Sequence, residues 1–239
     1  MLHKPRMSYV LHYAPDNASM IVRLALEQLN LPYSTQLVDR SVMGQQDAAY
    51  LALNPNGLIP VLETPTGPLF ETGAIMLWLA DTHSGLGPAP NNHARGDFLK
   101  WMFFTANTLH PALRMMFYPD KYIGPDPAHQ QALRFGLQDQ IKTSLAQLDR
   151  IAATKPSWLS ADTPSALDFY IVCCLRWCAL YPSDVSRDWF DLGTTPALAK
   201  LCRQIEDLPC TAALQAAEGL GNTPFSAPSY ATPPQGSAT

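Results

Sequence analysis

Strand-like segments are confined to the first eighty residues of this 239-residue chain, and this most constrains how it folds. In these eighty residues short strand-like runs alternate with helical ones, and the runs at 8–13 and 33–38 are predicted to be strands. Apolar residues at helical spacing predict a helix over 19–29 between them. Because a helix joins the two strands, and such crossovers return in the same direction, we predict that the strands are parallel.

Two further strands are predicted at 59–63 and 68–70, separated by the turn Thr64-Pro65-Thr66-Gly67. A four-residue turn of this kind predicts an antiparallel hairpin. A short helix at 48–53 precedes the hairpin, and a helix over 72–81 closes the segment. The order β-α-β-α-β-β-α is the thioredoxin-like arrangement.

The rest of the chain is predicted to be helical. Residues 82–92 are rich in Gly, Pro, His and Asn, which marks a linker. Ser165-Ala166-Leu167-Asp168 forms a capping box, with Asp in place of the usual Glu. The predicted helices run over 94–117, 127–153, 165–181 and 196–206.

We therefore divide the chain into four parts. A thioredoxin-like domain spans residues 7–83, a linker 84–93, an all-helical domain 94–215, and a tail rich in Pro, Ser and Thr 216–239. The tail has too few apolar residues for a core of its own. If it is ordered, its aromatic residues Phe225 and Tyr230 must dock on the body of the protein.

Composition excludes several classes of protein. The formal net charge is −4 and no basic run is present, which argues against a nucleic-acid partner. The longest apolar stretch, near 169–180, contains Arg176 and is too short to span a bilayer, so no membrane association is expected. Residues 1–6 include basic side chains but are not followed by an apolar core, which argues against a secretory signal. A cytoplasmic location is the resulting expectation.

The cysteines predict neither a disulfide framework nor a metal site. There are five, an odd number, and none forms a Cys-x-x-Cys pair. Free cysteines commonly serve as small apolar core residues, and we expect that role here.

The bond between Ile59 and Pro60 marks a candidate binding site. A proline that opens a strand forfeits a ladder hydrogen bond, so it normally lies at an edge or a bend. A cis peptide there would turn the N–H and C=O of Ile59 outward, toward an extended peptide-like ligand. Glu71 and Thr72 lie at the start of a helix, where free N–H groups attract a carboxylate and Glu71 can take an amine. This combination suits a γ-glutamyl tripeptide.

The same segments resemble the glutathione-site signature of cytosolic glutathione transferases. The matching residues are Asn54-Pro55-x-Gly57-x-x-Pro60-Val61-Leu62 and Glu71-Thr72-x-Ala74-Ile75, and Ser165-x-x-Asp168 is similar to the family's helix-six capping motif. The resemblance covers about residues 8–215. It implies a thioredoxin-like domain followed by an all-helical domain, glutathione as co-substrate, and a homodimer with active sites beside the interface.

The resemblance also implies roles for individual residues. The backbone of Ile59, before Pro60, would pair with the cysteinyl part of glutathione, and Glu71 with Thr72 would hold its γ-glutamyl end. Arg40 is a candidate for the glycine carboxylate, and a solvated surface arginine is the alternative.

The residue that activates the glutathione thiol is harder to identify from the sequence. Residues 13–19, Tyr13-Ala14-Pro15-Asp16-Asn17-Ala18-Ser19, are similar to the bacterial beta-class pattern Tyr-x-Pro-Gly-Ala-Cys-Ser. Ala18 stands at the cysteine position, which puts the mixed-disulfide chemistry of that class in doubt. Ser19 and Asn17 are candidate donors to the glutathione sulfur, followed by Tyr13. Helix capping is the alternative role for Asn17 and Ser19.

The helical half supplies another candidate. Asn107-Thr108-Leu109-His110 resembles the beta-class segment whose Leu-His pair brings a histidine toward the sulfur, so His110 is a candidate donor. A satisfied core or surface histidine is the alternative. Residues 115–118 (Met-Met-Phe-Tyr) are candidates to line an apolar cleft for the second substrate, and core packing is their alternative.

The sequence thus predicts a glutathione transferase that activates glutathione for attack on a small hydrophobic electrophile. A catalytically weak or silent homologue with a binding or regulatory role is an alternative, favoured by Ala18. A glutathione-dependent peroxidase or dehalogenase is another. The electrophile is not predictable, because such pockets are built from variable apolar side chains.

Overall fold

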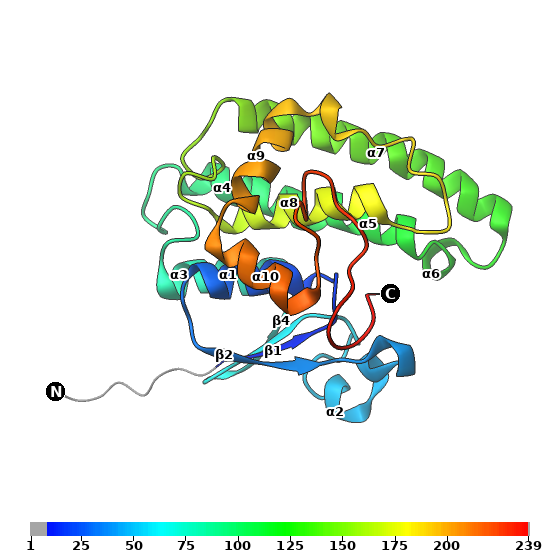
Figure 1. Ribbon diagram of the computed structural model, residues 1–239, viewed down its shortest axis with the longest axis horizontal. Coiled ribbons are helices and arrows are strands. Elements are labelled where there is room, and N and C mark those ends of the chain that lie inside the picture. The colour runs from blue at the N-terminus through cyan, green and yellow to red at the C-terminus, as the bar shows by residue number, and fades with distance from the viewer. Residues whose placement is uncertain (1–8, 239) are drawn as a thin grey trace. The chain divides into compact units, whose positions relative to one another are not determined.

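A computed structural model describes residues 9–238 of the chain (Figure 1). Ser8 of the first predicted strand and the basic residues 1–6 lie outside the described residues. Two compact units emerge. The first contains the chain up to Gly85, residues 207–222 and the chain from Tyr230 onward, and the second contains 86–206 and 223–229.

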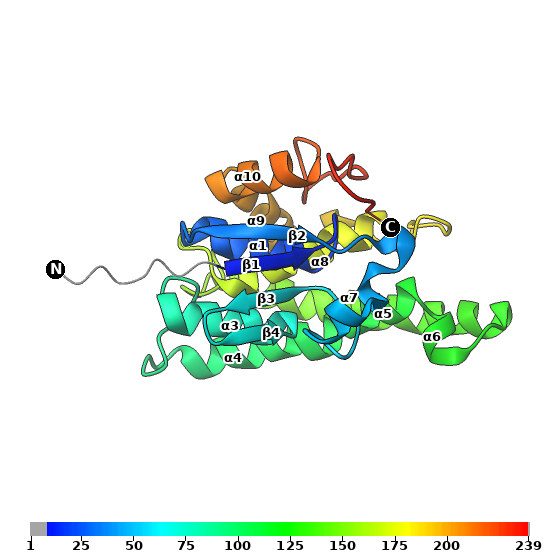
Figure 2. The same ribbon diagram turned by 90° about the horizontal axis from the view of Figure 1, so that it is seen from below.

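The first unit contains a four-stranded sheet in the order β2-β1-β3-β4, seen from top to bottom in Figure 2. β1 runs parallel to β2, and β3 runs antiparallel to both β1 and β4. The predicted parallel pair and the predicted hairpin are therefore confirmed. The strands are β1 (Tyr9–Tyr13), β2 (Tyr33–Leu37), β3 (Val61–Thr64) and β4 (Gly67–Phe70).

Helices cover both faces of this sheet. α1 (Ser19–Gln28) and α3 (Thr72–His83) lie on one face, and α2 (Ala48–Leu51), which follows two 3-10 turns at Arg40–Val42 and Gly44–Gln46, lies on the other (Figure 1). These helices and strands complete the predicted thioredoxin-like order, and the fold class is confirmed.

A helix that was not predicted, α10 (Pro209–Glu218), packs against α1. All eight residues at 19–26 of α1 are buried, so this helix needs a cover on the side away from the sheet. α10 provides that cover and groups with the sheet unit. The division based on sequence placed residues up to 215 with the helical domain. The difference arises because α10 buries its apolar face against α1, which lies almost 200 residues earlier in the chain.

Among its described residues, the second unit contains helices and loops but no strand. α4 is followed without interruption by a π-helical segment and α5, which together cover the predicted helix over 94–117. Pro111 has no N–H to donate, which accounts for the altered hydrogen bonding of the preceding turn. The elements are α4 (Arg95–Phe104), the π segment (Thr105–Leu109), α5 (His110–Phe117), α6 (Asp120–Ile123), α7 (Pro127–Ala153), α8 (Ala166–Leu180), a 3-10 turn (Leu192–Thr194) and α9 (Pro196–Glu206).

α8 forms the centre of the second unit, and nearly all of its residues are buried. The predicted capping box is confirmed. The Ser165 hydroxyl accepts from the N–H of Asp168 (3.3 Å), and the Asp168 carboxylate accepts from the N–H of Ser165 (2.8 Å). The five cysteines, three of them on α8, are buried thiols. Burial raises the pKa of Cys210 to about 11, so this thiol is un-ionised at neutral pH.

The tail docks in two parts. In the second unit Phe225 is buried, at 1% exposure, and Glu206 accepts hydrogen bonds from the N–H groups of Phe225 (2.8 Å) and Ser226 (2.7 Å). Arg176 donates to the carbonyl of Pro224 (3.0 Å). The tail from Tyr230 onward belongs to the first unit. Of the two aromatic residues expected to dock, Phe225 is enclosed, whereas Tyr230 stays exposed.

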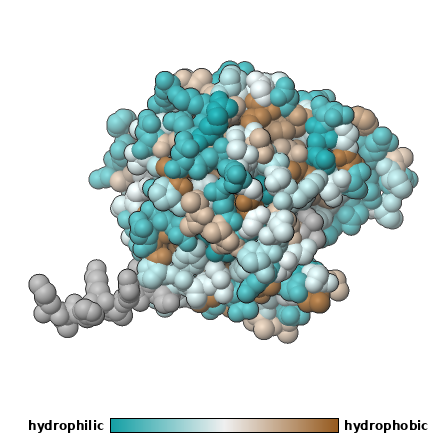
Figure 3. Space-filling view, in the orientation of Figure 1, coloured by the Kyte–Doolittle hydropathy of each residue, from teal (hydrophilic) through white to brown (hydrophobic). Residues whose placement is uncertain are grey.

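Several large apolar side chains remain on the surface. Figure 3 shows hydrophobic residues gathered over the segment between β2 and α2, where Val42 is 69% exposed and Met43 65%. In the second unit, Phe103 and Phe135 are also exposed. No helix among residues 9–238 combines the length and the apolar character needed to cross a bilayer.

Candidate glutathione site

The sheet register brings the predicted residues of the first unit to one end of the sheet. Val61 of β3 pairs with His12 of β1 and with Phe70 of β4. Continuing both pairings by one residue sets Pro60 beside Tyr13 and beside Glu71. Facing residues of antiparallel strands lie about 5 Å apart. The bend at Pro60, the start of α3 and the turn that leads into α1 are therefore neighbours.

The end of β2 reaches the same place. Tyr13 of β1 pairs with Leu37, and the Tyr13 carbonyl accepts the N–H of Val38 (2.8 Å). Arg40 follows two residues later, in the first 3-10 turn. Thus Arg40 also belongs to this end of the sheet.

Ile59 has the arrangement expected of a backbone clamp. The peptide bond between Ile59 and Pro60 is cis. The Ile59 side chain packs against the core formed by Val38, Tyr50 and Val61. Within residues 9–238, neither its N–H nor its C=O forms a hydrogen bond. With the side chain held inward, these two polar groups are left for a ligand.

The carbonyl just before the clamp is fixed by two side chains. The Leu58 carbonyl accepts hydrogen bonds from the Tyr50 hydroxyl and the Asn54 amide, both at 2.8 Å. Gly57, with a φ of +60°, closes the turn by donating to the Asn54 carbonyl (3.0 Å). The positive φ favours glycine here, and a Cβ on Gly57 would also lie 3.0 Å from the Gln45 carbonyl oxygen. Sequence reasoning missed Tyr50, because nothing local links its hydroxyl to Leu58.

The start of α3 offers donors for a carboxylate. Thr72, the first residue of α3, is 7% exposed. Glu71 before it has a φ of +70°, an unfavourable conformation for a residue with a side chain, and such strain clusters at functional sites. The Glu71 side chain is exposed. This end of α3 combines N–H groups, the Thr72 hydroxyl and a nearby carboxylate.

The three candidate thiol donors at the loop between β1 and α1 have different surroundings. Ser19 is fully buried, and its hydroxyl donates to the Ala14 carbonyl (3.0 Å). The Tyr13 ring packs beneath the Arg23 guanidinium, 4.8 Å from its centroid. Asn17 is partly exposed and its side-chain oxygen accepts the N–H of Ala18 (2.8 Å). The NH₂ group of Asn17 forms no hydrogen bond with residues 9–238, so it remains available as a donor.

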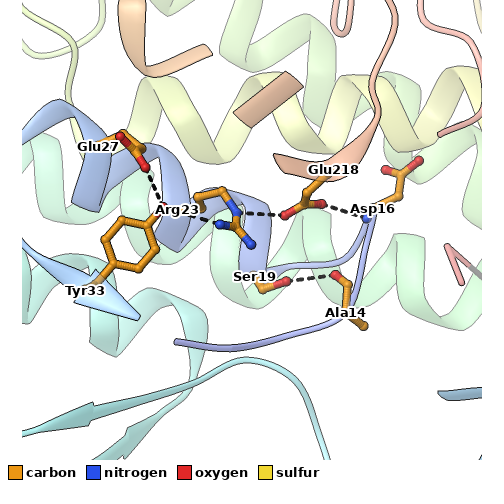
Figure 4. Close-up of polar contacts among 7 residues, drawn as sticks. All are labelled: Ala14, Asp16, Ser19, Arg23, Glu27, Tyr33 and Glu218. Atoms are coloured by element: carbon orange, nitrogen blue, oxygen red, sulfur yellow. Dashed lines mark hydrogen bonds and ion pairs between the residues drawn. The ribbon is translucent and has the colours of Figure 1, made fainter. Parts of the chain in front are cut away.

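A buried charge cluster holds this loop in place (Figure 4). One oxygen of Glu218, at the end of α10, accepts the backbone N–H of Asp16 (2.9 Å), and the other pairs with Arg23 (3.1 Å). Arg23 also donates to Tyr33, which in turn donates to Glu27. Burial raises the pKa of the Glu218 carboxyl to about 7, and Arg23 and the Asp16 N–H oppose this shift. The loop conformation therefore depends on a residue two hundred positions away.

Arg40 contacts the tail. Its guanidinium donates to the carbonyl of Ala238 (3.3 Å). This places the candidate for the glycine carboxylate against the protein's own C-terminal segment, which sequence reasoning did not anticipate.

His110 belongs to the second unit and is described there by itself. Its Nδ1 shares a hydrogen bond with the Tyr170 hydroxyl (2.8 Å), and its ring stacks on Trp177 with centroids 5.4 Å apart. Burial and the charge of Arg114 lower the pKa of His110 to about 4, so the ring is neutral at pH 7. Nε2 forms no hydrogen bond within residues 9–238.

The four residues proposed to line an apolar cleft differ in burial. Met116 is buried in the core of the second unit, whereas Met115, Phe117 and Tyr118 are half-buried. Phe117 packs edge-on against Tyr181. Among residues 9–238, no group of three or more His, Cys, Asp or Glu side chains is arranged to hold a metal ion.

A backbone clamp beside a helix N-terminus, on a thioredoxin-like sheet followed by a helical unit, defines the glutathione transferase class of fold. Two family matches agree: residues 18–82 match the glutathione S-transferase N-terminal domain, and residues 127–203 match the C-terminal domain. The chain belongs to the glutathione S-transferase family, whose members are transferases.

Individual relatives span most of the chain. Glutathione S-transferase GST-4.5 of Xanthomonas campestris pv. campestris is 29% identical over 88% of this chain and 98% of its own. Glutathione S-transferase GstB of Escherichia coli K12 is 33% identical over 59% of this chain and 68% of its own. A sphingomonad glutathione S-transferase, solved in complex with glutathione, is 26% identical with a TM-score of 0.70, covering 86% of this chain and 96% of that one.

The two hydrogen bonds to the Leu58 carbonyl make a first prediction. Tyr50→Phe should lower the free energy of unfolding by about 0.5–1.5 kcal/mol, because it removes one bond. Asn54→Ala should cost somewhat more, because it also removes the bond that the Asn54 side-chain oxygen accepts from the N–H of Asn56. The double variant should lose more than the sum, since the carbonyl is then left without a partner. Urea denaturation measures all three. Asn56→Ala is the matched control, and a loss as large as that of Asn54→Ala would contradict the assignment.

The charge cluster makes a second prediction. Glu218→Ala should lower the free energy of unfolding by about 3–5 kcal/mol, because it leaves the Arg23 charge buried without its carboxylate. Combining it with Arg23→Ala should cost less than the sum of the single losses. Denaturation of the four proteins of this cycle measures the coupling. Additive losses would show that the two side chains do not stabilise each other.

Proposed function

We propose that this protein binds glutathione in the first unit and activates its thiol for attack on a small hydrophobic electrophile. The main support is the backbone of Ile59, whose N–H and C=O form no hydrogen bond within residues 9–238 and whose partly buried side chain packs against the core beside the start of α3. In this proposal, Ile59 pairs with the cysteinyl part of glutathione, next to Pro60. Glu71 takes the γ-glutamyl amine, and Thr72 takes the γ-glutamyl carboxylate.

Asn17 is the proposed principal donor to the sulfur. A donor stabilises the thiolate, which is the attacking species. The NH₂ group of Asn17 is available, whereas Ser19 would have to release the Ala14 carbonyl first. His110 is the proposed second donor; because it is neutral at pH 7, it would contribute an N–H group rather than a charge.

The proposed subclass is beta-like but without the cysteine of that class. Ala18 occupies the cap of α1 and has no sulfur to form a mixed disulfide with glutathione. Such a site works through hydrogen bonds alone. The proposed compartment is the cytoplasm, and the five cysteines kept as buried thiols support it.

A weakly active or silent homologue is the second candidate function. One of the three candidate donors of the loop is already engaged, because the Ser19 hydroxyl donates to the Ala14 carbonyl, and Ala18 supplies no thiol in place of the class cysteine. With fewer groups to stabilise a thiolate, bound glutathione would remain a thiol.

The pKa of bound glutathione separates the two functions. The ultraviolet absorbance of the thiolate, titrated against pH, reports the pKa of bound glutathione. That pKa should lie about two units below the pKa of a free thiol, which is about 8.5. Asn17→Ala should raise that pKa and slow conjugation of a model electrophile by about tenfold or more. His110→Ala should have a smaller effect in the same direction.

Ser19→Ala serves as the matched control, since its hydroxyl is committed to Ala14. An unshifted thiol pKa in the unmodified protein would support the silent homologue. Failure of glutathione to bind at all would remove both functions.

A homodimer is proposed, and the exposed apolar side chains support it. Val42 and Met43 lie on the first unit, and Phe103 and Phe135 on the second. Such side chains are enriched where subunits meet.

Sedimentation velocity tests this assembly. The unmodified protein should sediment as a dimer, and replacing both Val42 and Met43 by lysine should shift it toward the monomer, because charge would be buried at the interface. Thr66→Lys, on the exposed turn between β3 and β4, is the control. A monomeric unmodified protein would refute the proposal.

A further inference from the structure

The last part of the chain, residues 230–238, lies along the end of the sheet that carries the candidate site; we call it the C-terminal strap. It belongs to the first unit, together with α10 and the sheet. Three contacts hold it: one is at the end of α10, next to Glu218, and the other two are on segments beside the proposed glutathione site.

The first contact is at the end of α10. The N–H of Thr232 donates to the Gly219 carbonyl (2.9 Å). Gly219 has a φ of +65°, and a Cβ there would lie 1.9 Å from the carbonyl oxygen of Thr232. Backbone meets backbone at this point, directly after Glu218, whose carboxylate holds the loop N–H of Asp16. The strap is therefore attached to α10 at the residue next to the one that holds the loop between β1 and α1.

The second contact is on the loop itself. A Cβ on Gly236 would lie 2.8 Å from a methyl group of Leu37 and 3.4 Å from Pro15. Gly236 thus fits against the end of β2 and the turn after β1, and Pro15 is buried. Its φ of +76° also favours glycine at this position.

The third contact is the hydrogen bond from Arg40 to the Ala238 carbonyl (3.3 Å). A guanidinium prefers a carboxylate to a carbonyl, because charge-assisted pairs are shorter and about twice as strong. A carboxylate of glutathione that binds Arg40 would therefore meet the strap there.

We propose that Pro15, Leu37 and Arg40 form a binding site for the protein's own C-terminal strap, and that the strap competes with the glycine end of glutathione for Arg40. This rests on the proposed function. Glutathione binding then requires the strap to leave Arg40. Only the molecules in which the strap is released can bind glutathione, so the apparent affinity falls in proportion to that released fraction. Because the strap is tethered, its effective concentration at the site is high, on the order of millimolar. Prolines 233 and 234 stiffen it and reduce the entropy lost on docking.

Isothermal titration of glutathione into four proteins tests this competition. They are the full chain, the chain lacking residues 230–239, and both again with Arg40→Gln. Removing the strap should tighten glutathione binding by about three- to tenfold when Arg40 is present. It should leave the affinity unchanged when residue 40 is glutamine, because there is then no shared partner.

Gly236→Val provides a second test that keeps the whole chain. Its Cβ would meet Leu37 and its φ would be strained, so it should loosen the strap and tighten glutathione binding in the same direction. Gln235→Val, at an exposed neighbouring position, is the matched control and should leave the affinity unchanged. If the shortened chain does not fold, this pair decides the question.

Equal or weaker binding by both the shortened chain and Gly236→Val would overturn the competition while leaving glutathione binding intact. An equal gain with arginine and with glutamine at position 40 would also overturn it. If neither the full nor the shortened chain binds glutathione, the proposed function fails, and the competition fails with it.

Discussion

Val61 pairs with His12 on one side and with Phe70 on the other, and this double pairing decides where the candidate residues of the first unit lie. It sets the bend at Pro60 between the end of β1 and the start of α3. A shift of one residue in either pairing would send the side chains of β3 to the opposite face and move the clamp away from α3. The turn from Asn54 to Leu58 then fixes the approach to the bend, through the hydrogen bonds that Tyr50 and Asn54 donate to one carbonyl.

The loop between β1 and α1 depends on a different kind of interaction. Its backbone is held by Glu218, a carboxylate removed from water and paired with an equally buried arginine. Two such charges are costly to bury singly, so each requires the other. As a result, the amino end of α1 keeps its position only while α10 stays docked. The C-terminal part of the chain is therefore structural for the proposed glutathione site, although it lies far from that site in the sequence.

The features that could be predicted from the sequence are those determined by residues close together in the chain. The hairpin follows from a four-residue turn between two apolar runs, and the cap of α8 follows from Ser165 and Asp168. Both are confirmed, together with the order of strands and helices. The residues proposed to hold glutathione also came from local motifs, and their roles stay predictions.

What the sequence did not show depends on contacts between distant segments. α10 and the strap return to the first unit after more than a hundred residues of helical structure. No sequence pattern within α10 or the strap indicates the segment against which it packs. Similarly, the sequence offers Ser19 as a possible donor, whereas the structure shows its hydroxyl bonded to Ala14. It offers Arg40 as a carboxylate ligand or a surface residue, and does not indicate its contact with Ala238.

A crystal structure of the protein with bound glutathione would show whether the Ile59 backbone forms the proposed clamp. We expect the cysteinyl N–H and C=O of glutathione within about 3 Å of the Ile59 carbonyl and N–H, with the γ-glutamyl carboxylate at the start of α3. Glutathione bound elsewhere, or bound with the Ile59 backbone still unpaired, would contradict this proposal.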